Sequence, residues 1–244
     1  ARCGWINDPN GLYYQNGQYH LYFQYNEFNT QWENMSWGHA VSTDLLHWKQ
    51  LDTVLYPDEN GTVYSGCAVL NEKGLLDLPK GIPLYFYTEA GGKSSWSKGK
   101  KFIQKLAYSL DGGNTLIKTE EPLIGHIVSE NRDPKVYWHE EANRYYMILY
   151  LDKFEYAIFN SKDLKEWEMT QRFTAESCWE CPDLREIPCE DGTKKWVFWC
   201  ADGYYMVVEF DGKMITTFGK RKAAYHMPLP YAAQTFYGTK DRVI

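Results

Sequence analysis

Three acidic residues stand out because each lies in a short motif of turn-forming and aromatic residues. Asp8 lies within Trp-Ile-Asn-Asp-Pro-Asn-Gly, Asp133 lies between an arginine and a proline, and Glu180 lies between a tryptophan and a Cys-Pro pair. Cleavage of a glycosidic bond needs one carboxyl group to protonate the leaving oxygen and a second one on the opposite side of the sugar. These three acids, if the fold brings them together, are therefore suited to glycoside hydrolysis.

The residues next to each acid favour different roles for them. Arg132 beside Asp133 is expected to lower the pKa of that aspartate and to keep it ionised. Glu180 would lie near two other acids, which makes it the candidate for general acid/base. Either Asp8 or Asp133 could then be the nucleophile. Each motif also has a purely structural explanation, since an Arg-Asp pair can be a structural ion pair and Asn-Gly can form a hairpin tip.

Backbone preferences around Asp8 predict a short strand that ends near this residue. Proline disfavours helix at the residue before it, and Asn10-Gly11 favours a turn. Residues 19–25 alternate between polar and apolar side chains after a further turn signal at Asn16-Gly17. We therefore expect residues 19–25 to pair with the strand that carries Asp8.

Strand patterns recur along the chain in a similar order, and Ser-x-Asp-Leu-x-x-Trp occurs twice, at residues 42–48 and 161–167. Equivalent positions repeat roughly every 45 to 70 residues, with about four short strand patterns in each interval. The positions used as anchors are Asp8, Ser65, Asp133, Glu180 and Gln234. Repeats of four strands are typical of a β-propeller. We therefore expect an all-β, five-bladed β-propeller with an incomplete fifth blade, whose first strands bring the three acids together.

Composition narrows the classes of partner. Aromatic residues make up 17% of the chain, with 10 Trp and 20 Tyr, which fits both β-strands and carbohydrate sites. A net charge of −6 without a basic run argues against a nucleic acid or an anionic membrane surface as partner, and no apolar stretch reaches membrane-spanning length. Cys178 and Cys181 have C-x-x-C spacing, but no second pair completes a zinc site. We therefore expect no metal site at these cysteines.

Other properties are less constrained by the sequence. No secretory leader is recognised and the six cysteines are sparse, which slightly favours a cytoplasmic location, although a secreted one stays open. The first motif begins abruptly, and the fifth repeat stops early, so we expect the natural chain to extend at both ends. The oligomeric state is not indicated.

The three acidic motifs resemble those of glycoside hydrolase family 32, the invertases, inulinases and levanases. Four further segments fit the family in the same order, at residues 23–26, 32–40, 64–66 and 231–236. This resemblance extends over nearly the whole chain. It implies a five-bladed propeller, usually followed by a β-sandwich that is absent here, so that residues 1–244 would be a catalytic propeller domain truncated at both ends.

The resemblance also implies an activity. Such enzymes cleave β-fructofuranosyl linkages in sucrose or fructans with retention, through a covalent fructosyl-enzyme intermediate and without metal or cofactor. By this match Asp8 would be the nucleophile, Glu180 the acid/base, and Asp133 the residue that binds fructose hydroxyls and stabilises the transition state. The residues expected to bind the substrate are Trp5, Asn7, Gln24, Trp32, Tyr64, Ser65 and Arg132.

Some positions depart from the usual family pattern, namely Glu27, Ser36 and residues 227–230, and these fall on the leaving-group side. Three alternatives stay open. The chain could transfer fructose to another sugar, although Asn10 fits the hydrolase form of the first motif. It could bind fructan without cleaving it. A propeller glycosidase for arabinose or xylose polymers would share a similar acid triad, but it would not explain the first and third motifs together.

Overall fold

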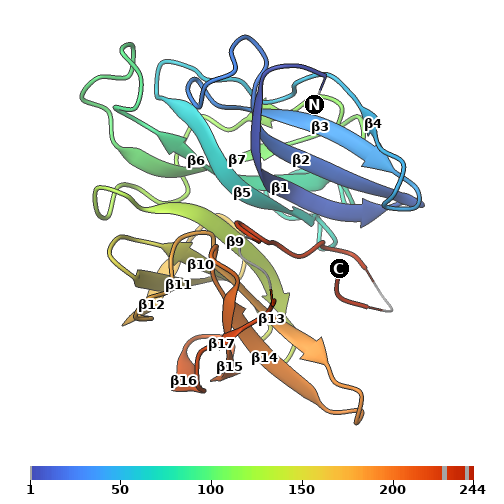
Figure 1. The fold of residues 1–244 in the computed structure, drawn as a ribbon, viewed down its shortest axis with the longest axis vertical. Helices are drawn as coiled ribbons and strands as arrows, with labels where there is room; N and C mark the ends of the chain where they lie inside the picture. The colour runs from blue at the N-terminus through green and yellow to red at the C-terminus, as the bar shows by residue number, and fades with distance from the viewer. Residues whose placement is uncertain (1, 227–229, 240–241) are drawn as a thin grey trace.

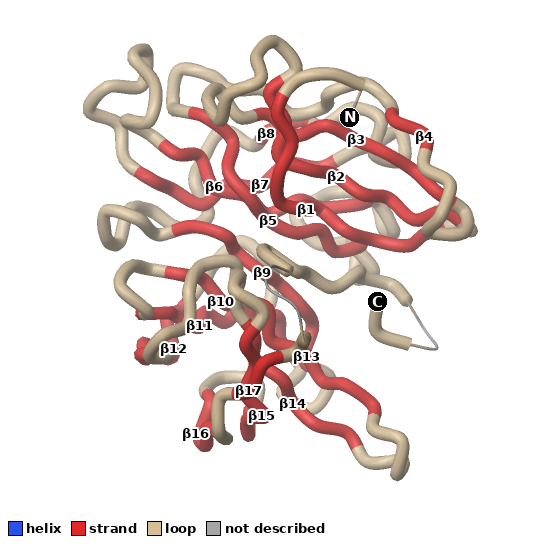
Figure 2. The backbone as a smooth tube through the Cα atoms, viewed as in Figure 1, coloured by secondary structure: helices blue, strands red, loops and turns tan. Residues whose placement is uncertain are grey.

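The computed structural model describes residues 2–226, 230–239 and 242–244, which form strands joined by loops (Figure 1). Figure 2 shows the same backbone with strands and loops and no helix in the described part. None of the described segments forms a helix that is long and apolar enough to cross a membrane. The chain is therefore all-β over these ranges, as the sequence predicted.

Four antiparallel sheets follow one another along the chain, each with its strands paired in sequence order. The first contains β1 (Trp5–Gln15), β2 (Gln18–Asn26), β3 (Ser36–Ser42) and β4 (Lys49–Gln50). The second contains β5 (Thr62–Leu70), β6 (Pro83–Ala90), β7 (Phe102–Tyr108) and β8 (Ile117–Lys118). The third contains β9 (Arg132–His139), β10 (Arg144–Tyr150), β11 (Glu155–Ser161) and β12 (Glu168–Thr174). The fourth contains β13 (Asp183–Pro188), β14 (Lys194–Trp199), β15 (Tyr204–Phe210) and β16 (Ile215–Phe218), and β17 (Lys222–Ala223) pairs with β15.

These sheets are the blades of a propeller. The first strands of the first three blades lie at the centre, where β5 contacts both β1 and β9, with the later strands of each blade further out (Figure 1). Because the first strand of every blade faces this centre, residues on different blades can meet there. The predicted propeller is therefore confirmed for four blades.

A fifth blade is not formed by the described residues. The segment of residues 230–239 contributes one isolated parallel bridge, between Tyr237 and Tyr13 of β1, and no named strand. The backbone of Tyr237 forms its hydrogen bonds with the first blade, since its N–H donates to the carbonyl of Leu12 at 3.0 Å and its carbonyl accepts from the N–H of Tyr14 at 2.8 Å. Residues 242–244 form no strand either, so the fifth-blade motif at residues 231–236 is a docked segment in the described part of the chain.

The predicted first hairpin is confirmed, but the predicted extent of its first strand is wrong. Asn16 and Gly17 have φ angles of 51° and 82° and join β1 to β2, as their turn signal predicted. The expected end of the strand near Asp8 was wrong, because β1 continues through it to Gln15. The register between β1 and β2 instead shifts twice, between Ile6 and Pro9 and between Asn10 and Tyr13. The turn-forming residues are accommodated as bulges inside a long strand.

The repeated Ser-x-Asp-Leu-x-x-Trp motif forms the turn after the third strand of a blade. In the first copy the Ser42 hydroxyl accepts from the N–H of Leu45 at 2.9 Å, and the Trp48 ring N–H donates to the Leu45 carbonyl at 3.0 Å. In the second copy the Ser161 hydroxyl accepts from the N–H of Leu164 at 2.8 Å, and the Trp167 ring N–H donates to the Leu164 carbonyl at 3.2 Å. These motifs therefore serve the fold.

Most of the aromatic excess is also structural. One buried cluster between the first two blades contains Tyr13, Tyr22 and Tyr85. Two buried histidines stack on it, with His20 Nδ1 3.2 Å from His39 Nε2. Burial lowers the pKa of His20 to about 4 and that of His39 to about 3. Both rings are therefore neutral in the folded protein at neutral pH.

This histidine pair predicts a loss of stability in acid. In an unfolded chain both rings titrate near 6.5, so between pH 6.5 and 4 the unfolded chain binds more protons than the folded one. The free energy of unfolding should fall as the pH is lowered through this window, by up to about 1.4 kcal/mol per pH unit for each histidine. Urea unfolding measured at several pH values gives this slope.

A matched set of variants isolates the pair from other titrating groups. The H20Q/H39Q variant keeps a polar contact between the side chains but removes both titrations, so its stability should fall less steeply in acid. His47 is exposed and bonds to Asp44, which raises the pKa of its imidazole, so H47Q should keep the steep slope. Equal slopes in H20Q/H39Q and the unsubstituted protein would show that the pair is not responsible.

Candidate active site

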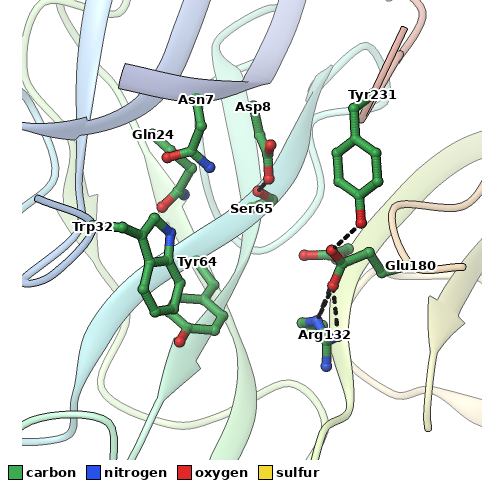
Figure 3. Close-up of a pocket in the computed structure, with 10 residues that line it drawn as sticks. Asn7, Asp8, Gln24, Trp32, Tyr64, Ser65, Arg132, Glu180 and Tyr231 are labelled. Atoms are coloured by element: carbon green, nitrogen blue, oxygen red, sulfur yellow. Dashed lines mark hydrogen bonds and ion pairs between the residues drawn. The ribbon is translucent and has the colours of Figure 1, made fainter. Parts of the chain in front are cut away.

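One cavity of about 190 Å³ gathers all of the predicted site residues except Trp5, together with Tyr231 (Figure 3). The side chains come from the first strands of three blades, from β2 and from segments outside the strands. They are Asn7 and Asp8 on β1, Gln24 on β2, Tyr64 and Ser65 on β5, Arg132 and Asp133 on β9, Trp32, Glu180, and Tyr231 in the C-terminal segment. Residues that are distant in sequence thus meet at the propeller centre.

Backbone irregularities aim several of these side chains into the cavity. Asp8 lies in the first register shift of β1, and Ser65 lies where the register of β5 shifts between Tyr64 and Gly66. Asp133 has a φ angle of 61°, a left-handed conformation that is uncommon for a residue other than glycine. Bulges and left-handed residues redirect side chains that a regular strand would point elsewhere. Asp8 and Asp133 are thus aimed by local distortions of the first strands.

Asp8 is fixed by contacts between the first two blades. The Ser65 hydroxyl donates to Asp8 Oδ2 at 3.0 Å, and the side-chain oxygen of Asn10 accepts from the N–H of Gly66 at 3.2 Å. Gly66 has no room for a side chain, because a Cβ atom there would lie 1.9 Å from the carbonyl oxygen of Phe86 on β6. The carboxylate of Asp8 is therefore oriented from a neighbouring blade.

Glu180 is held through both of its carboxylate oxygens. Arg132 donates from Nε and Nη2 to Oε2 at 2.8 Å and 2.5 Å, and the Tyr231 hydroxyl donates to Oε1 at 2.6 Å (Figure 3). Burial and the bond to Glu180 raise the pKa of Tyr231, so this hydroxyl keeps its proton. The side chain of Glu180 is 22% exposed, which leaves it accessible from the cavity.

Asp133 has a different environment from the one predicted. It is 4% exposed, and its Oδ2 accepts from the N–H of Cys181 at 3.1 Å and lies 3.8 Å from Arg132 Nε. Burial first, and then the charge of Glu180, raise the pKa of Asp133 well above its usual range. The prediction that Arg132 holds this pKa low was wrong, because desolvation outweighs the arginine. A positive charge developing nearby would favour the ionised form of Asp133.

A second wall of the cavity is suited to a sugar. Asn7, Gln24, Trp32 and Tyr64 lie on one side of Asp8, and Arg132 and Glu180 lie on the other (Figure 3). The buried Nε2 of Gln24 and the buried hydroxyl of Tyr64 have no hydrogen-bond partner in the described part of the chain. Buried polar groups need such partners, and sugar hydroxyls could supply them. The half-exposed ring of Trp32 could cover a C–H face.

Two aromatic residues differ from the prediction. Trp5 does not line the cavity, and its ring N–H donates to the side-chain oxygen of Asn7 at 2.7 Å. Trp5 therefore orients the side chain of Asn7, which lines the cavity, without lining it itself. Tyr231 was missed as a site residue, although it begins the motif at residues 231–236 that was recognised as the fifth repeat. The available signal was an aromatic residue close to Gln234, the repeat position equivalent to the acids.

The cysteines and the positions that depart from the family pattern lie as follows in the structure. All six cysteines have free thiols, and Cys181 contacts Asp133 through its thiol at 3.4 Å. Among the described residues, no group of three or more His, Cys, Asp or Glu side chains is arranged to hold a metal ion. Glu27 accepts hydrogen bonds from Thr53 and Tyr56, at 3.0 Å and 3.2 Å. The departure at residues 227–229 lies outside the described residues.

Comparison with known proteins gives consistent relatives. The family model for the glycosyl hydrolases family 32 N-terminal domain matches residues 1–244. A levanase of Bacillus subtilis is 36% identical over 234 residues, which cover 86% of this chain and 33% of that protein. A fructan beta-fructosidase of Streptococcus mutans is 35% identical over 274 residues, which cover 99% of this chain and 17% of that protein. The chain thus spans a third or less of the length of these two relatives.

Solved structures show the same architecture. The beta-fructofuranosidase from Schwanniomyces occidentalis, complexed with fructosyl-erythritol, superposes with a TM-score of 0.90 at 31% identity, covering 100% of this chain and 51% of that one. The exo-inulinase from Aspergillus awamori superposes with a TM-score of 0.87 at 30% identity, covering 98% and 56%. The four blades described above are therefore shared with these proteins.

Proposed function

Because the chain belongs to glycosyl hydrolase family 32, we propose that it hydrolyses β-fructofuranosyl linkages of sucrose or fructans with retention, through a covalent fructosyl-enzyme intermediate. The observation that carries this proposal is a single cavity in which Ser65 orients Asp8 and Arg132 and Tyr231 orient Glu180. Relatives named levanase, fructan beta-fructosidase and beta-fructofuranosidase support the substrate class. Since the described site residues come from all parts of the chain, we propose that residues 1–244 hold the catalytic set.

In this mechanism the fructosyl ring lies against Asn7, Gln24 and Trp32. Asp8 attacks the anomeric carbon while Glu180, in its acid form, donates its proton to the leaving oxygen, so that an ester to Asp8 forms and a sugar leaves. Glu180 then removes a proton from water, and the water oxygen attacks the anomeric carbon, breaks its bond to Asp8 and releases fructose with retained configuration. Both carboxyl groups thereby return to their starting states.

The contacts of the two aspartates that the residues alone left as alternative nucleophiles support one of them. Asp133 is almost fully buried and accepts from both the N–H and the thiol of Cys181, whereas Asp8 receives one hydrogen bond from the Ser65 hydroxyl. We assign the nucleophile to Asp8. Asp133, together with Arg132, would bind fructose hydroxyls and stabilise the positive charge that develops on the ring, an effect strengthened by low dielectric.

Release of free fructose tests the proposal. The protein is incubated with sucrose, inulin and levan, and the anomer formed first is identified by proton NMR before mutarotation. We expect fructose from at least one substrate, initially with the configuration of the bond that was cleaved. No fructose from any of the three would reject the activity, and initial inversion would reject the covalent intermediate.

Trp32 provides a prediction about binding. We expect W32A to raise KM for the fructoside about tenfold, which corresponds to about 1.4 kcal/mol, with a smaller effect on kcat, because the ring covers the sugar in both the ground and transition states. Trp96 is similarly exposed at 49%, lies outside the cavity and donates to the Asp58 carbonyl, so W96A is the control. An unchanged KM in W32A would remove this ring from the substrate site.

A further inference from the structure

The segment that carries Tyr231 has no sheet of its own. Figure 1 shows it passing between the half of the molecule with β1–β8 and the half with β9–β17. Near its start, the Tyr231 hydroxyl donates to Glu180 Oε1 at 2.6 Å, and further along the segment Tyr237 forms a β-bridge to Tyr13 of β1. Since regular strand pairing does not hold the middle of this segment, other contacts must set its position.

A buried ion pair occupies that middle position. Lys135 on β9 is 2% exposed and Asp183 on β13 is fully buried, and Lys135 Nζ lies 3.2 Å from Asp183 Oδ2. The same carboxylate oxygen accepts from the N–H and from the hydroxyl of Thr235, both at 2.9 Å. Lys135 Nζ donates to the Thr235 carbonyl at 2.9 Å. The pair therefore binds the amide, the hydroxyl and the carbonyl of one residue.

Further hydrogen bonds hold the segment on both sides of Thr235. Lys135 Nζ also donates to the side-chain oxygen of Gln234 at 3.3 Å, and Arg185 donates to the carbonyl of Phe236 at 2.5 Å. On the side of Tyr231, the N–H of Ala232 donates to the carbonyl of Ala201 at 2.8 Å, and the N–H of Ala201 donates to the carbonyl of Glu180 at 2.7 Å. The segment and the acid are thus connected through backbone as well as side chains.

Burying two opposite charges is a poor way to gain stability alone. Desolvation of both ions opposes folding, and apolar side chains of similar volume often pack as well. Burial acts against the charge of Lys135, but Asp183, together with Tyr137 and Cys67, outweighs it and raises the pKa of the lysine. Beyond packing, the ion pair provides hydrogen-bond donors and acceptors in fixed positions, and Thr235 makes three hydrogen bonds to them.

We propose that Lys135 and Asp183 form a clamp that docks residues 231–237 at the propeller centre and thereby positions the Tyr231 hydroxyl on Glu180. Lys135 is then a positioning residue that acts through Tyr231. The effect on the reaction rests on the proposed function, in which Glu180 is the acid/base. The docking itself does not depend on that function. A carboxyl group held by Tyr231 stays in place for proton transfer, so loss of the clamp affects kcat more than KM.

Hydrogen exchange tests the docking. We expect K135M to speed amide exchange in residues 231–237 by about tenfold or more, because it removes the donor to the Thr235 carbonyl and leaves Asp183, which accepts from the Thr235 N–H, without its lysine. The variant K135M/D183N removes both charges together, so no single ion is left buried, and it should show the same local effect if K135M fails to fold. K105M is the control, since Lys105 is 4% exposed and bonds the Glu120 carbonyl on another blade. Unchanged exchange in residues 231–237 of the folded variant would overturn the clamp.

Kinetics tests the link to Glu180. We expect Y231F and K135M each to lower kcat about tenfold, to keep KM within about twofold and to shift the same limb of the pH profile. The double variant K135M/Y231F should be no slower than the slower single variant, because both act through one hydroxyl. Multiplying effects, or a wild-type pH profile in K135M, would overturn the positioning role. If the unsubstituted protein released no fructose, the proposed function would fail while exchange would still decide the docking.

Discussion

The D8N variant should lose at least about 10⁴-fold in kcat on any fructoside that the protein cleaves. The amide is nearly the same size as the carboxylate, so the cavity and the hydrogen bond from Ser65 can remain, but a neutral amide cannot form the ester. Initial rates of fructose release, with circular dichroism to confirm the fold, measure the effect. Because binding groups elsewhere in the cavity are intact, KM should change far less than kcat.

Two companion variants make the result for Asp8 specific. S65A removes only the bond that orients Asp8, so we expect a smaller loss, on the order of tenfold. D52N changes an exposed aspartate and should leave the rate unchanged. D8N activity within about tenfold of the unsubstituted protein would show that another group attacks the sugar, and Asp133 would then be tested in the same way.

Replacing Glu180 by glutamine should produce a loss that depends on the leaving group. For sucrose, whose leaving alkoxide needs a proton, we expect E180Q to lower kcat by about 10³-fold or more. A fructoside with an activated aryl leaving group needs no proton, so its first step should be much less affected. The second step should still be slow, because water has lost its base, and the ester on Asp8 should accumulate.

Added azide provides the control for this assignment. Azide attacks the ester without needing a base, so it should restore turnover of the aryl fructoside by E180Q and yield a fructosyl azide. The same addition should not restore D8N, which forms no ester. An equal loss for sucrose and for the aryl fructoside, without a response to azide, would contradict a role for Glu180 in proton transfer.

The sequence predicted which residues meet in the cavity better than it predicted the backbone that supports them. Asp8, Asp133 and Glu180 were found because acids between turn-forming and aromatic residues recur at a common spacing, and a propeller brings such positions together. The strand through Asp8 was misjudged, because local preferences describe Asn-Gly as a turn and do not show that β2 can pair past it with two bulges.

Tertiary environment explains the other differences. The pKa of Asp133 was predicted from its neighbour in sequence, Arg132, whereas burial at the propeller centre decides its direction. Tyr231 was not assigned to the site because its contact with Glu180 depends on how the C-terminal segment docks. The expected fifth blade is replaced in the described residues by that docked segment, which no repeat pattern distinguishes from a strand.

The central claim is that Asp8 becomes covalently bonded to fructose, and one measurement addresses it directly. The E180Q variant is incubated with an activated aryl fructoside, quenched in acid, digested and analysed by peptide mass spectrometry. We expect a peptide that contains Asp8 to gain the mass of one fructosyl unit, and fragmentation to place that mass on Asp8. The unit on a peptide that contains Asp133, or no adduct during continued turnover, would contradict the mechanism.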